Sequence, residues 1–517
     1  MSVSVKVFCL LLTAIRISDQ KSTPESDSYV AAVVEFKLTS NSTQALKEYV
    51  HYITMASEKN ADVVVFPEMT LVRKAEVVRV PIHGSLRQHP IPALTPHLYD
   101  EPLVAISKAA RDNGIYVVIN VQEQMDCSSS LGEYCPEKKV YRFNTNVVFD
   151  RSGAVIDRYR KINLFGEATR HPALKQELGI FSTDFGVTFG HFICFDVLFQ
   201  VPAVQVVQKY NLTDIIFPTM WFSEMPFLTA VQNQQAYAYS MNVNFLAANA
   251  NNIHVGTAGS GIYSGRAGAL VSMMTGIPST RLLVERVPKV PGKLTRTYPG
   301  PIFNNPSDPD NLLLNKDVSL ASHVSKELVS GFQEFSLTEK DVRCKFTVRI
   351  NQTGQSHKYR AFIQDSSNTY VKRHVAVASC SIVACRYDDV VSCPYRFSAE
   401  DAKVEFEELQ IEMTTYPHRH NSSLDCENII YYPVSLRINK FPLDSHNFTY
   451  SESNQNGDNE NGGREKISYK LNAPQNDLIA FAVWGRIYDK DISGSYHVTE
   501  EDESNFSQFE NMIYKTV

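Results

Sequence analysis

The first 250 residues alternate between short apolar runs and stretches with helical spacing, and this alternation constrains the fold more than any other feature. The apolar runs are rich in Val and Ile, and the stretches between them repeat apolar residues every three or four positions, as amphipathic helices do. The predicted strands are Val30–Phe36, Ala61–Phe66 and Ile115–Val121, and the helical repeats are Leu46, Val50, Ile53 and Leu103, Ile106, Ala110. This β-α-β-α order predicts a layered α/β domain.

A turn signal indicates that the sheet is mixed. Asp150-Arg-Ser-Gly153 separates apolar runs at Asn146–Phe149 and Ala154–Tyr159, which predicts a hairpin. The alternation resumes after residue 194. There we expect helices at Val201–Tyr210 and Leu228–Met241, and strands at Asp214–Phe217 and Asn244–Ala250.

The second half of the chain has a different character. The 517 residues exceed the usual size of one hydrophobic core, and from about Val287 to Leu314 the sequence is rich in Pro, Gly and Asn without periodicity, as a linker is. Beyond residue 330 the apolar runs are short and β-like, as in Cys344–Ile350, Tyr370–Val383 and Ile479–Ile487. The polar stretch Ser451–Gly463 is predicted to be a disordered loop. We therefore expect a signal peptide at 1–22, an α/β domain at 23–325 and a β-rich domain at 326–517.

Several features predict a secreted protein. Lys6 precedes the apolar run Val7–Ile15, which is typical of a signal peptide and too short to span a bilayer. The C-terminus lacks the apolar tail that a removable lipid-anchor signal needs, so no membrane anchor is expected. A net charge of -6 argues against a nucleic-acid partner. The predicted glycosylation sites are Asn41, Asn211, Asn351, Asn421, Asn447 and Asn505.

Eight cysteines remain after loss of Cys9 with the signal peptide. With Cys194 set aside, the others are expected to pair in an oxidising compartment and to staple the β-rich domain. Cys127 with Cys135 would close a small loop, and five downstream cysteines then leave at least one free, which the sequence does not identify. A zinc site from Cys380, Cys385, Cys393, His418 and His420 has no known ligand spacing, so neither a metal nor another cofactor is expected.

Three segments supply a carboxylate, an amine and a thiol. Glu68 follows Phe66-Pro67, Lys161 follows Arg158-Tyr-Arg160, and Cys194 is predicted to end an apolar strand that turns at Asp196. A thiol attacks weakly until a base removes its proton, and Glu68 is the candidate base. The oxyanion of the resulting adduct needs fixed positive charge and N–H donors, which Lys161 and the amide of Phe195 could supply.

At these residues the chain resembles the nitrilase superfamily of carbon–nitrogen hydrolases, and within it the vanin and biotinidase branch. Matching segments run from about Tyr29 to Asp491. They are Tyr29–Glu35, Arg142–Asp150, Lys161–Glu167, Cys194–Phe199, Phe217–Trp221, Val243–Asn249, Gly259–Ile262 and Gly485–Lys490.

The resemblance implies an α-β-β-α sandwich and the catalytic residues Glu68, Lys161 and Cys194. It also implies a supporting role for Glu167 near the Lys and a pocket wall at Trp221, whereas His191 is expected to be a strand residue. The implied substrate is a small-molecule amide. Pantetheine is preferred, while biocytin and a noncatalytic binding protein with the nitrilase fold remain alternatives. The oligomeric state is not predicted.

Overall fold

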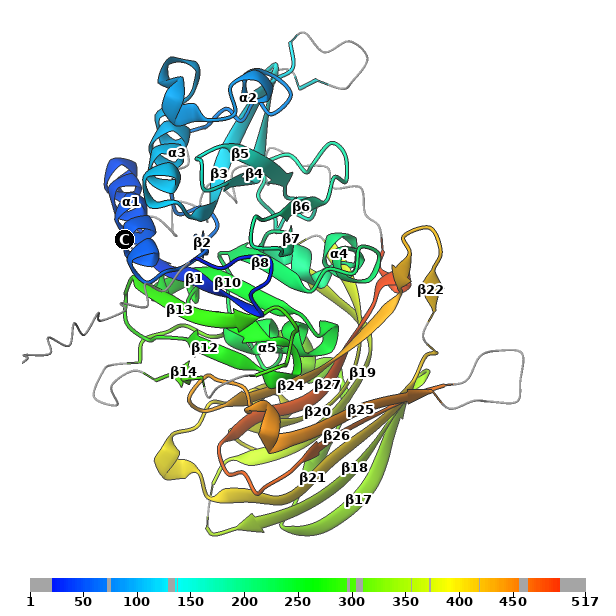
Figure 1. The fold of residues 1–517 in the computed structure, drawn as a ribbon. Helices are drawn as coiled ribbons and strands as arrows, with labels where there is room; N and C mark the ends of the chain where they lie inside the picture. Colours follow the sequence, from blue (N-terminus) through cyan, green and yellow to red (C-terminus); the bar gives the residue numbers. More distant parts are fainter. Residues whose placement is uncertain are drawn as a thin grey trace, which may run out of the picture.

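The computed structural model describes residues 21–71, 76–128, 135–136, 138–294, 298–303, 310–354, 356–371, 373–417, 419–454 and 464–492. These residues form an α/β sandwich, drawn in blue to green in Figure 1, followed by two further β-sheets in yellow-green to red. The predicted fold class, an α-β-β-α sandwich followed by a β-rich domain, is confirmed.

Two mixed sheets form the centre of the sandwich, as the hairpin signal predicted. The first has the order β13 (Arg281–Pro288), β1 (Ser28–Lys37), β2 (Val63–Val65), β3 (Tyr116–Asp126), β4 (Val140–Phe149) and β5 (Val155–Arg160). The second has the order β14 (Gly300–Ile302), β12 (Ala269–Met273), β11 (Ser260–Ser264), β10 (Asn244–Asn251), β8 (Asp214–Thr219), β7 (Thr188–His191) and β6 (Gly179–Ser182). They join where Phe36 and Lys37 pair with Ala250 and Asn251.

Strand β1 shows why these apolar runs form the middle of a sandwich. Tyr29, Ala31 and Val33 belong to the hydrophobic core between the two sheets. The alternate residues, including Val30 and Val34, belong to the core beneath the outer helices. Side chains of a strand point to opposite faces in turn, so a strand covered on both faces is apolar throughout.

Helices cover both outer faces (Figure 1). The helices are α1 (Ser42–Glu58), α2 (Ser85–Gln88), α3 (Glu101–Asn113), α4 (Gln205–Gln208) and α5 (Ala230–Met241). Helices α1 and α3 contribute to the core under the first sheet. Helix α5 begins with a capping box, in which the Thr229 N–H donates to Gln232 Oε1 at 3.0 Å. It lies between the second sheet and β24 of the C-terminal domain.

The helix predicted over Val201–Tyr210 is wrong in part. An irregular turn occupies Gln200–Val204, and regular helix is limited to α4. Pro202 explains the difference, because a residue before proline is forced toward extended backbone, and Val201 has φ -109° and ψ 120°.

Two five-stranded antiparallel sheets form the C-terminal domain. The inner sheet has the order β16 (Val324–Leu328), β19 (Lys358–Tyr370), β20 (Arg373–Cys385), β27 (Leu478–Ile487) and β24 (Ile429–Arg437). The outer sheet has the order β17 (Gly331–Glu339), β18 (Val342–Gln352), β21 (Val404–Thr415), β26 (Glu465–Leu471) and β25 (Phe448–Asn454). Short pairs join β15 (Asn315–Lys316) to β9 (Glu224–Met225), and β22 (His420–Asn421) to β23 (Cys426–Glu427).

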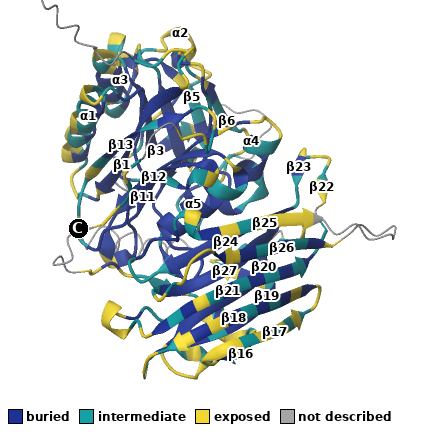
Figure 2. Ribbon diagram, turned by 60° about the horizontal axis from the view of Figure 1, so that its bottom comes forward, coloured by how far each residue is buried: buried dark blue, intermediate teal, exposed yellow. Residues whose placement is uncertain are grey.

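The two C-terminal sheets differ in how they are covered. In the outer sheet buried and exposed residues alternate, as the stripes of Figure 2 show, because one face meets solvent. In the inner sheet, β20 and β27 are buried on both faces. On β20, Ala378 and Ile382 face the outer sheet, whereas Val377 and Val383 join the core that also contains Cys194. A continuous apolar core therefore connects the two domains.

Disulfides form as the cysteine count predicted. Cys127 pairs with Cys135, Cys344 of β18 pairs with Cys380 of β20, and Cys385 pairs with Cys393. The second bond joins the outer and inner C-terminal sheets. Cys426 is the unpaired downstream cysteine, and Cys194 is also free. The three cysteines of the rejected zinc site are all in disulfides, and His418 lies outside the described residues.

The prediction of a disordered loop over Ser451–Gly463 is wrong at its start. Ser451 to Asn454 belong to β25 and pair with β26, because alternate partners such as Ile467 and Tyr469 bury one face of this sheet. Residues 455–463 lie outside the described part. Within the part that is described, no helix is long and apolar enough to cross a membrane.

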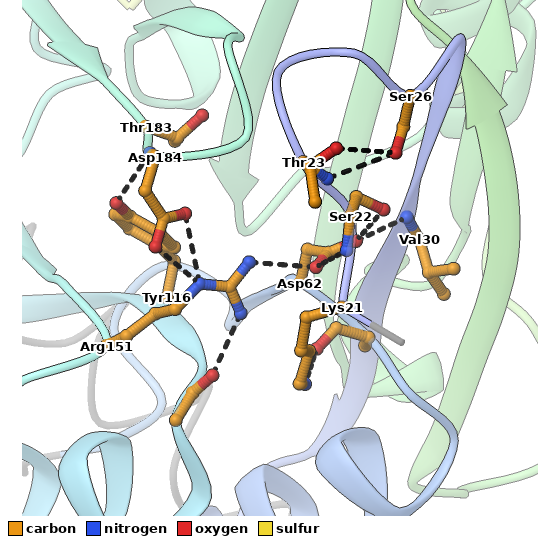
Figure 3. Close-up of polar contacts among 12 residues, drawn as sticks. Lys21, Ser22, Thr23, Ser26, Val30, Asp62, Tyr116, Arg151, Thr183 and Asp184 are labelled. Carbon is orange, nitrogen blue, oxygen red and sulfur yellow. Dashed lines mark hydrogen bonds and ion pairs between the residues drawn. The ribbon is translucent and has the colours of Figure 1, made fainter. Parts of the chain in front are cut away.

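The start of the described chain is held by a buried carboxylate (Figure 3). Asp62 accepts hydrogen bonds from the Ser22 N–H at 3.0 Å, the Ser22 hydroxyl at 2.6 Å and the Val30 N–H at 2.9 Å. Arg151 pairs with Asp62 at 2.8 Å and with Asp184 at 2.9 Å. These contacts fix the segment that leads into β1, while residues 1–20 of the predicted signal peptide lie outside the described range.

Candidate active site

Cys194 begins a tight 3-10 turn, Cys194–Leu198. The predicted strand that ends on Cys194 is wrong in this detail, because β7 ends at His191 and two residues intervene. Cys194 has φ +49°, a left-handed conformation that residues other than glycine adopt at a cost. Such strain persists only where the surroundings impose it, and it is common at active sites.

Asp196 imposes this conformation. Its buried carboxylate accepts hydrogen bonds from the Tyr159 hydroxyl at 2.7 Å, the Asn163 N–H at 2.8 Å and the Ile193 N–H at 3.1 Å. Burial raises the pKa of Asp196 to about 6, while Lys161 and these donors favour the charged form. The sequence analysis marked Asp196 as the turn residue that supports Cys194, but it did not identify the groups that hydrogen-bond to it.

Lys161 lies between two carboxylates. Its Nζ is 2.8 Å from Glu68 Oε1 and 2.6 Å from Glu167 Oε1, and its side chain is 1% exposed. Burial lowers the pKa of Lys161, but Glu167 and Glu68 outweigh burial and raise it well above its usual value. The ammonium is therefore charged at neutral pH. The structure thus places Glu167, a candidate supporting residue, beside Lys161.

An asparagine that the sequence analysis did not single out completes this cluster. Asn144 Nδ2 donates to Glu68 Oε1 at 2.7 Å and to Glu167 Oε1 at 3.3 Å. Asn120 Nδ2 in turn donates to Asn144 Oδ1 at 2.8 Å. The signal was present in the segment Phe143-Asn-Thr-Asn146 of β4, because two buried asparagines on one face of a strand need polar partners.

The backbone of Met220 connects Glu68 with Cys194. Its N–H donates to Glu68 Oε2 at 2.8 Å, and its carbonyl accepts from the Cys194 thiol at 3.8 Å. Burial raises the pKa of Cys194 far above its usual value, the Glu68 carboxylate adds to the rise, and Lys161 opposes it. The thiol is therefore protonated in this state, and a base is needed to make it nucleophilic.

Aromatic side chains surround the thiol in a small cavity that opens to solvent. Phe195 and Trp221 both line it, as the prediction for Trp221 required. The Trp221 Nε1–H donates to the Leu228 carbonyl at 2.8 Å, which fixes the ring. None of the described hydrogen bonds uses the Phe195 backbone N–H, which the sequence analysis assigned to the oxyanion.

The C-terminal domain contributes to this cavity. Tyr370, the last residue of β19, lines it, with its ring centroid 6.2 Å from that of Phe195. The next residue, Val371, packs on the loop that carries Glu167: a Cβ at Gly166, which has φ +73°, would lie 2.7 Å from Val371 Cγ1. Both the positive φ and the close approach of Val371 exclude a residue other than glycine at position 166. Sequence reasoning did not detect this contribution.

Arg486 also reaches the Cys194 turn from the C-terminal domain. Its buried guanidinium donates through Nε to the carbonyl of Leu198, the last residue of that turn, at 2.9 Å. Its Nη2 pairs with Asp491 at 2.7 Å.

His191 is a strand residue, as predicted. It is buried at the end of β7, with Nε2 2.8 Å from Asp157 Oδ2. No group of three or more His, Cys, Asp or Glu side chains among the described residues could hold a metal ion.

Comparisons with known proteins agree with this architecture. The carbon–nitrogen hydrolase family model matches residues 30–278, and the vanin C-terminal domain model matches residues 313–491. Vanin-like protein 1 of Drosophila melanogaster is 32% identical over 94% of this chain and 90% of its own length. Pantetheinase of Sus scrofa is 27% identical over 85% of this chain and 82% of its own, and human biotinidase 35% over 48% and 47%. The chain therefore belongs to the vanin family of carbon–nitrogen hydrolases.

Proposed function

We propose that the protein is a secreted amidohydrolase that cleaves pantetheine to pantothenate and cysteamine through a thioester on Cys194. One observation carries the proposal: a buried, charged Lys161 lies between Glu68 and Glu167. The Met220 peptide links this charge cluster to the only free thiol of the cavity, Cys194.

The first half-reaction acylates the enzyme. Glu68 takes the Cys194 proton, and the thiolate sulfur attacks the amide carbonyl carbon. The carbonyl oxygen becomes an oxyanion, which the Lys161 ammonium and the Phe195 N–H stabilise. Glu68 passes the proton to the amide nitrogen, the carbon–nitrogen bond breaks, and cysteamine leaves with the thioester in place.

In the second half-reaction Glu68 again acts first as a base and then as an acid, with water as the nucleophile and the thiol as the leaving group. Glu68 takes a proton from water, and the hydroxide oxygen attacks the thioester carbon. The carbon–sulfur bond breaks, the sulfur regains a proton from Glu68, and pantothenate leaves as the acid. Glu167 and Asn144 are positioning residues in this scheme, because they hold Lys161 and Glu68 through hydrogen bonds of 2.6 and 2.7 Å.

The relatives support pantetheine as the substrate and biocytin as the second candidate. Pantetheinase of Sus scrofa aligns with 85% of this chain, biotinidase of Takifugu rubripes with 73% and human biotinidase with 48%. Biocytin hydrolysis by the same steps would release biotin and lysine.

Amine release distinguishes the two substrates. The purified protein is incubated with pantetheine and with biocytin in parallel, and cysteamine and lysine are quantified. We expect cysteamine release by the parent and none by Cys194→Ala, whose thermal melting should stay near that of the parent because the substitution removes one small buried thiol with a long hydrogen bond of 3.8 Å to the Met220 carbonyl. Lysine release without cysteamine would assign the biotinidase reaction, and activity in Cys194→Ala would refute the nucleophile.

We also propose that the signal peptide lies within residues 1–22, that the two domains divide near residue 325, and that the sequons carry glycans. Asn41, Asn211 and Asn351 are exposed, and Asn421 and Asn447 are partly buried at the surface. Asn505 lies outside the described residues. Three disulfides support an oxidising compartment.

A further inference from the structure

Glu224 is the one charged side chain that lines the cavity around Cys194 among the described residues. The other walls are Phe165, Phe195, Leu198, Trp221, Phe222, Leu228 and Tyr370. Ligand pockets typically combine apolar walls with a few polar groups that orient the ligand. A lone carboxyl in an aromatic cavity has that character.

The backbone at Glu224 is rigid. Its N–H donates to the Leu228 carbonyl at 3.1 Å, and the Leu228 N–H donates back to the Glu224 carbonyl at 2.9 Å. Strand β15 also pairs with β9, the strand of Glu224, and Asn315 lies opposite Glu224 in that pairing. The carboxyl group is therefore presented to the cavity from a fixed position.

The Glu224 carboxyl has no side-chain or backbone donor in the described part of the protein. Asp317, the charged group that acts on it, is itself an acid and accepts hydrogen bonds from the Ser319 N–H at 2.8 Å and hydroxyl at 2.6 Å. Burial, then Asp317, raise the pKa of Glu224 to about 7. A desolvated carboxyl without a donor gains from a ligand that supplies one.

The ionisable groups around Lys161 also favour a ligand with donor groups over an anionic one. Lys161 lies between the carboxyl groups of Glu68 and Glu167, so acidic groups outnumber basic groups in this cluster. Glu224 adds a further carboxyl group on the cavity wall, and Asp317 acts on it. Such a cavity favours cationic and neutral donor groups over anionic ones.

We propose that Glu224 is a specificity-determining residue that accepts a hydrogen bond from a hydroxyl, N–H or ammonium group of the substrate and disfavours anionic substrates. The inference deepens the proposed function and rests on it, because it requires an amide bound in the Cys194 cavity. The hydroxyl and N–H donors of pantetheine beyond the scissile amide belong to its acyl part, so the donor is expected there.

A matched substrate series tests the role of Glu224. Three cysteamine amides share one acyl chain and differ in one group, which is a hydroxyl, its methyl ether or a carboxylate. Their kcat/KM values are measured for the parent, Glu224→Gln and Glu224→Leu. Glu334→Gln is the control, because Glu334 is an exposed glutamate on β17 that is paired with Lys345 at 3.3 Å.

We expect the parent to prefer the hydroxyl amide over its ether by about 10- to 100-fold, the range for hydrogen bonds to charged groups. Glu224→Leu should remove this preference. Glu224→Gln keeps an acceptor, so it should retain most of the preference but accept the carboxylate amide about tenfold better than the parent does. Glu334→Gln should change neither ratio.

Binding separates recognition from catalysis. The same three amides are titrated by calorimetry into Cys194→Ala and into Cys194→Ala with Glu224→Leu. We expect the second change to weaken only the hydroxyl amide, by about tenfold or more. Equal binding by both variants, or unchanged substrate ratios in Glu224→Leu, would overturn the role of Glu224. Ligand-selective binding without turnover in the parent would instead overturn the hydrolase mechanism and leave Glu224 as the recognition residue.

Discussion

Lys161→Met tests whether the charge of Lys161 both stabilises the fold and performs chemistry. Methionine keeps most of the side-chain volume but removes the ammonium that lies 2.6 Å from Glu167 and 2.8 Å from Glu68. Both carboxylates are then buried without their cation. The change should therefore lower stability as well as turnover.

The two expected losses have different sizes. Removing one partner of a buried ion pair costs about 3–5 kcal/mol. At about 2–4 °C per kcal/mol for a domain of this size, the melting temperature should fall by roughly 6–20 °C. Loss of an oxyanion donor lowers turnover by about 100- to 1000-fold.

The assay compares melting and turnover for Lys161→Met, for Lys161→Met with Glu167→Gln, and for Lys358→Met. The double variant removes one of the two carboxylates, so it should regain part of the stability and none of the turnover. Lys358 is the matched control, since it has two acidic partners at 3.7 Å but is 37% exposed. Its replacement should cost less than about 1 kcal/mol. A Lys161→Met enzyme that melts within about 2 °C of the parent would refute this reasoning.

Three further predictions concern the fold and the location of the protein. Expressed from its full sequence in animal cells, it should appear in the medium, lose apparent mass on glycosidase treatment, and show no release from cells by phospholipase; unmodified protein in the cytosol would contradict this. Asp196→Asn should lower both stability and turnover, because its amide group would point a donor at the N–H groups from which Asp196 accepts hydrogen bonds. The melting temperature and kcat measure the two losses. Parent-like values for both would exclude the proposed support of the Cys194 turn. Burial raises the pKa of Glu35 to about 7, so the folded state favours its protonated form. The free energy of unfolding should therefore decrease as pH rises from about 4.5 to 7. Urea titrations of Glu35→Gln should show a smaller decrease over that pH range.

Local patterns predicted most of the first domain because its strands are short and buried on both faces. The hairpin of β4 and β5 followed from a four-residue turn signal, β1 and β8 from runs that contain Val or Ile, and β10 from the apolar run at Asn244–Ala250. The failures have local causes as well. Pro202 shortened a helix, and the backbone left the strand geometry two residues before Cys194.

The candidate site was predictable where one residue carries the chemistry and not where residues act through others. Glu68, Lys161 and Cys194 were proposed from residue type and order, and the structure brings Glu68 and Lys161 into direct contact. Asn144 was missed, because its role depends on a neighbouring strand. Tyr370 was also missed, because its place in the cavity depends on a packing between domains that no local spacing encodes.

The position of Tyr370 has an evolutionary consequence. Tyr370 and Cys194 face one cavity although they belong to different domains, so the shape of that cavity depends on the sequences of both. Exchanging the second domain between relatives should therefore alter substrate preference even when every residue of the first is kept. Substitutions that alter substrate preference are then expected in both domains. A chimaera of two relatives should keep its activity only when the cavity residues of its two domains fit one another.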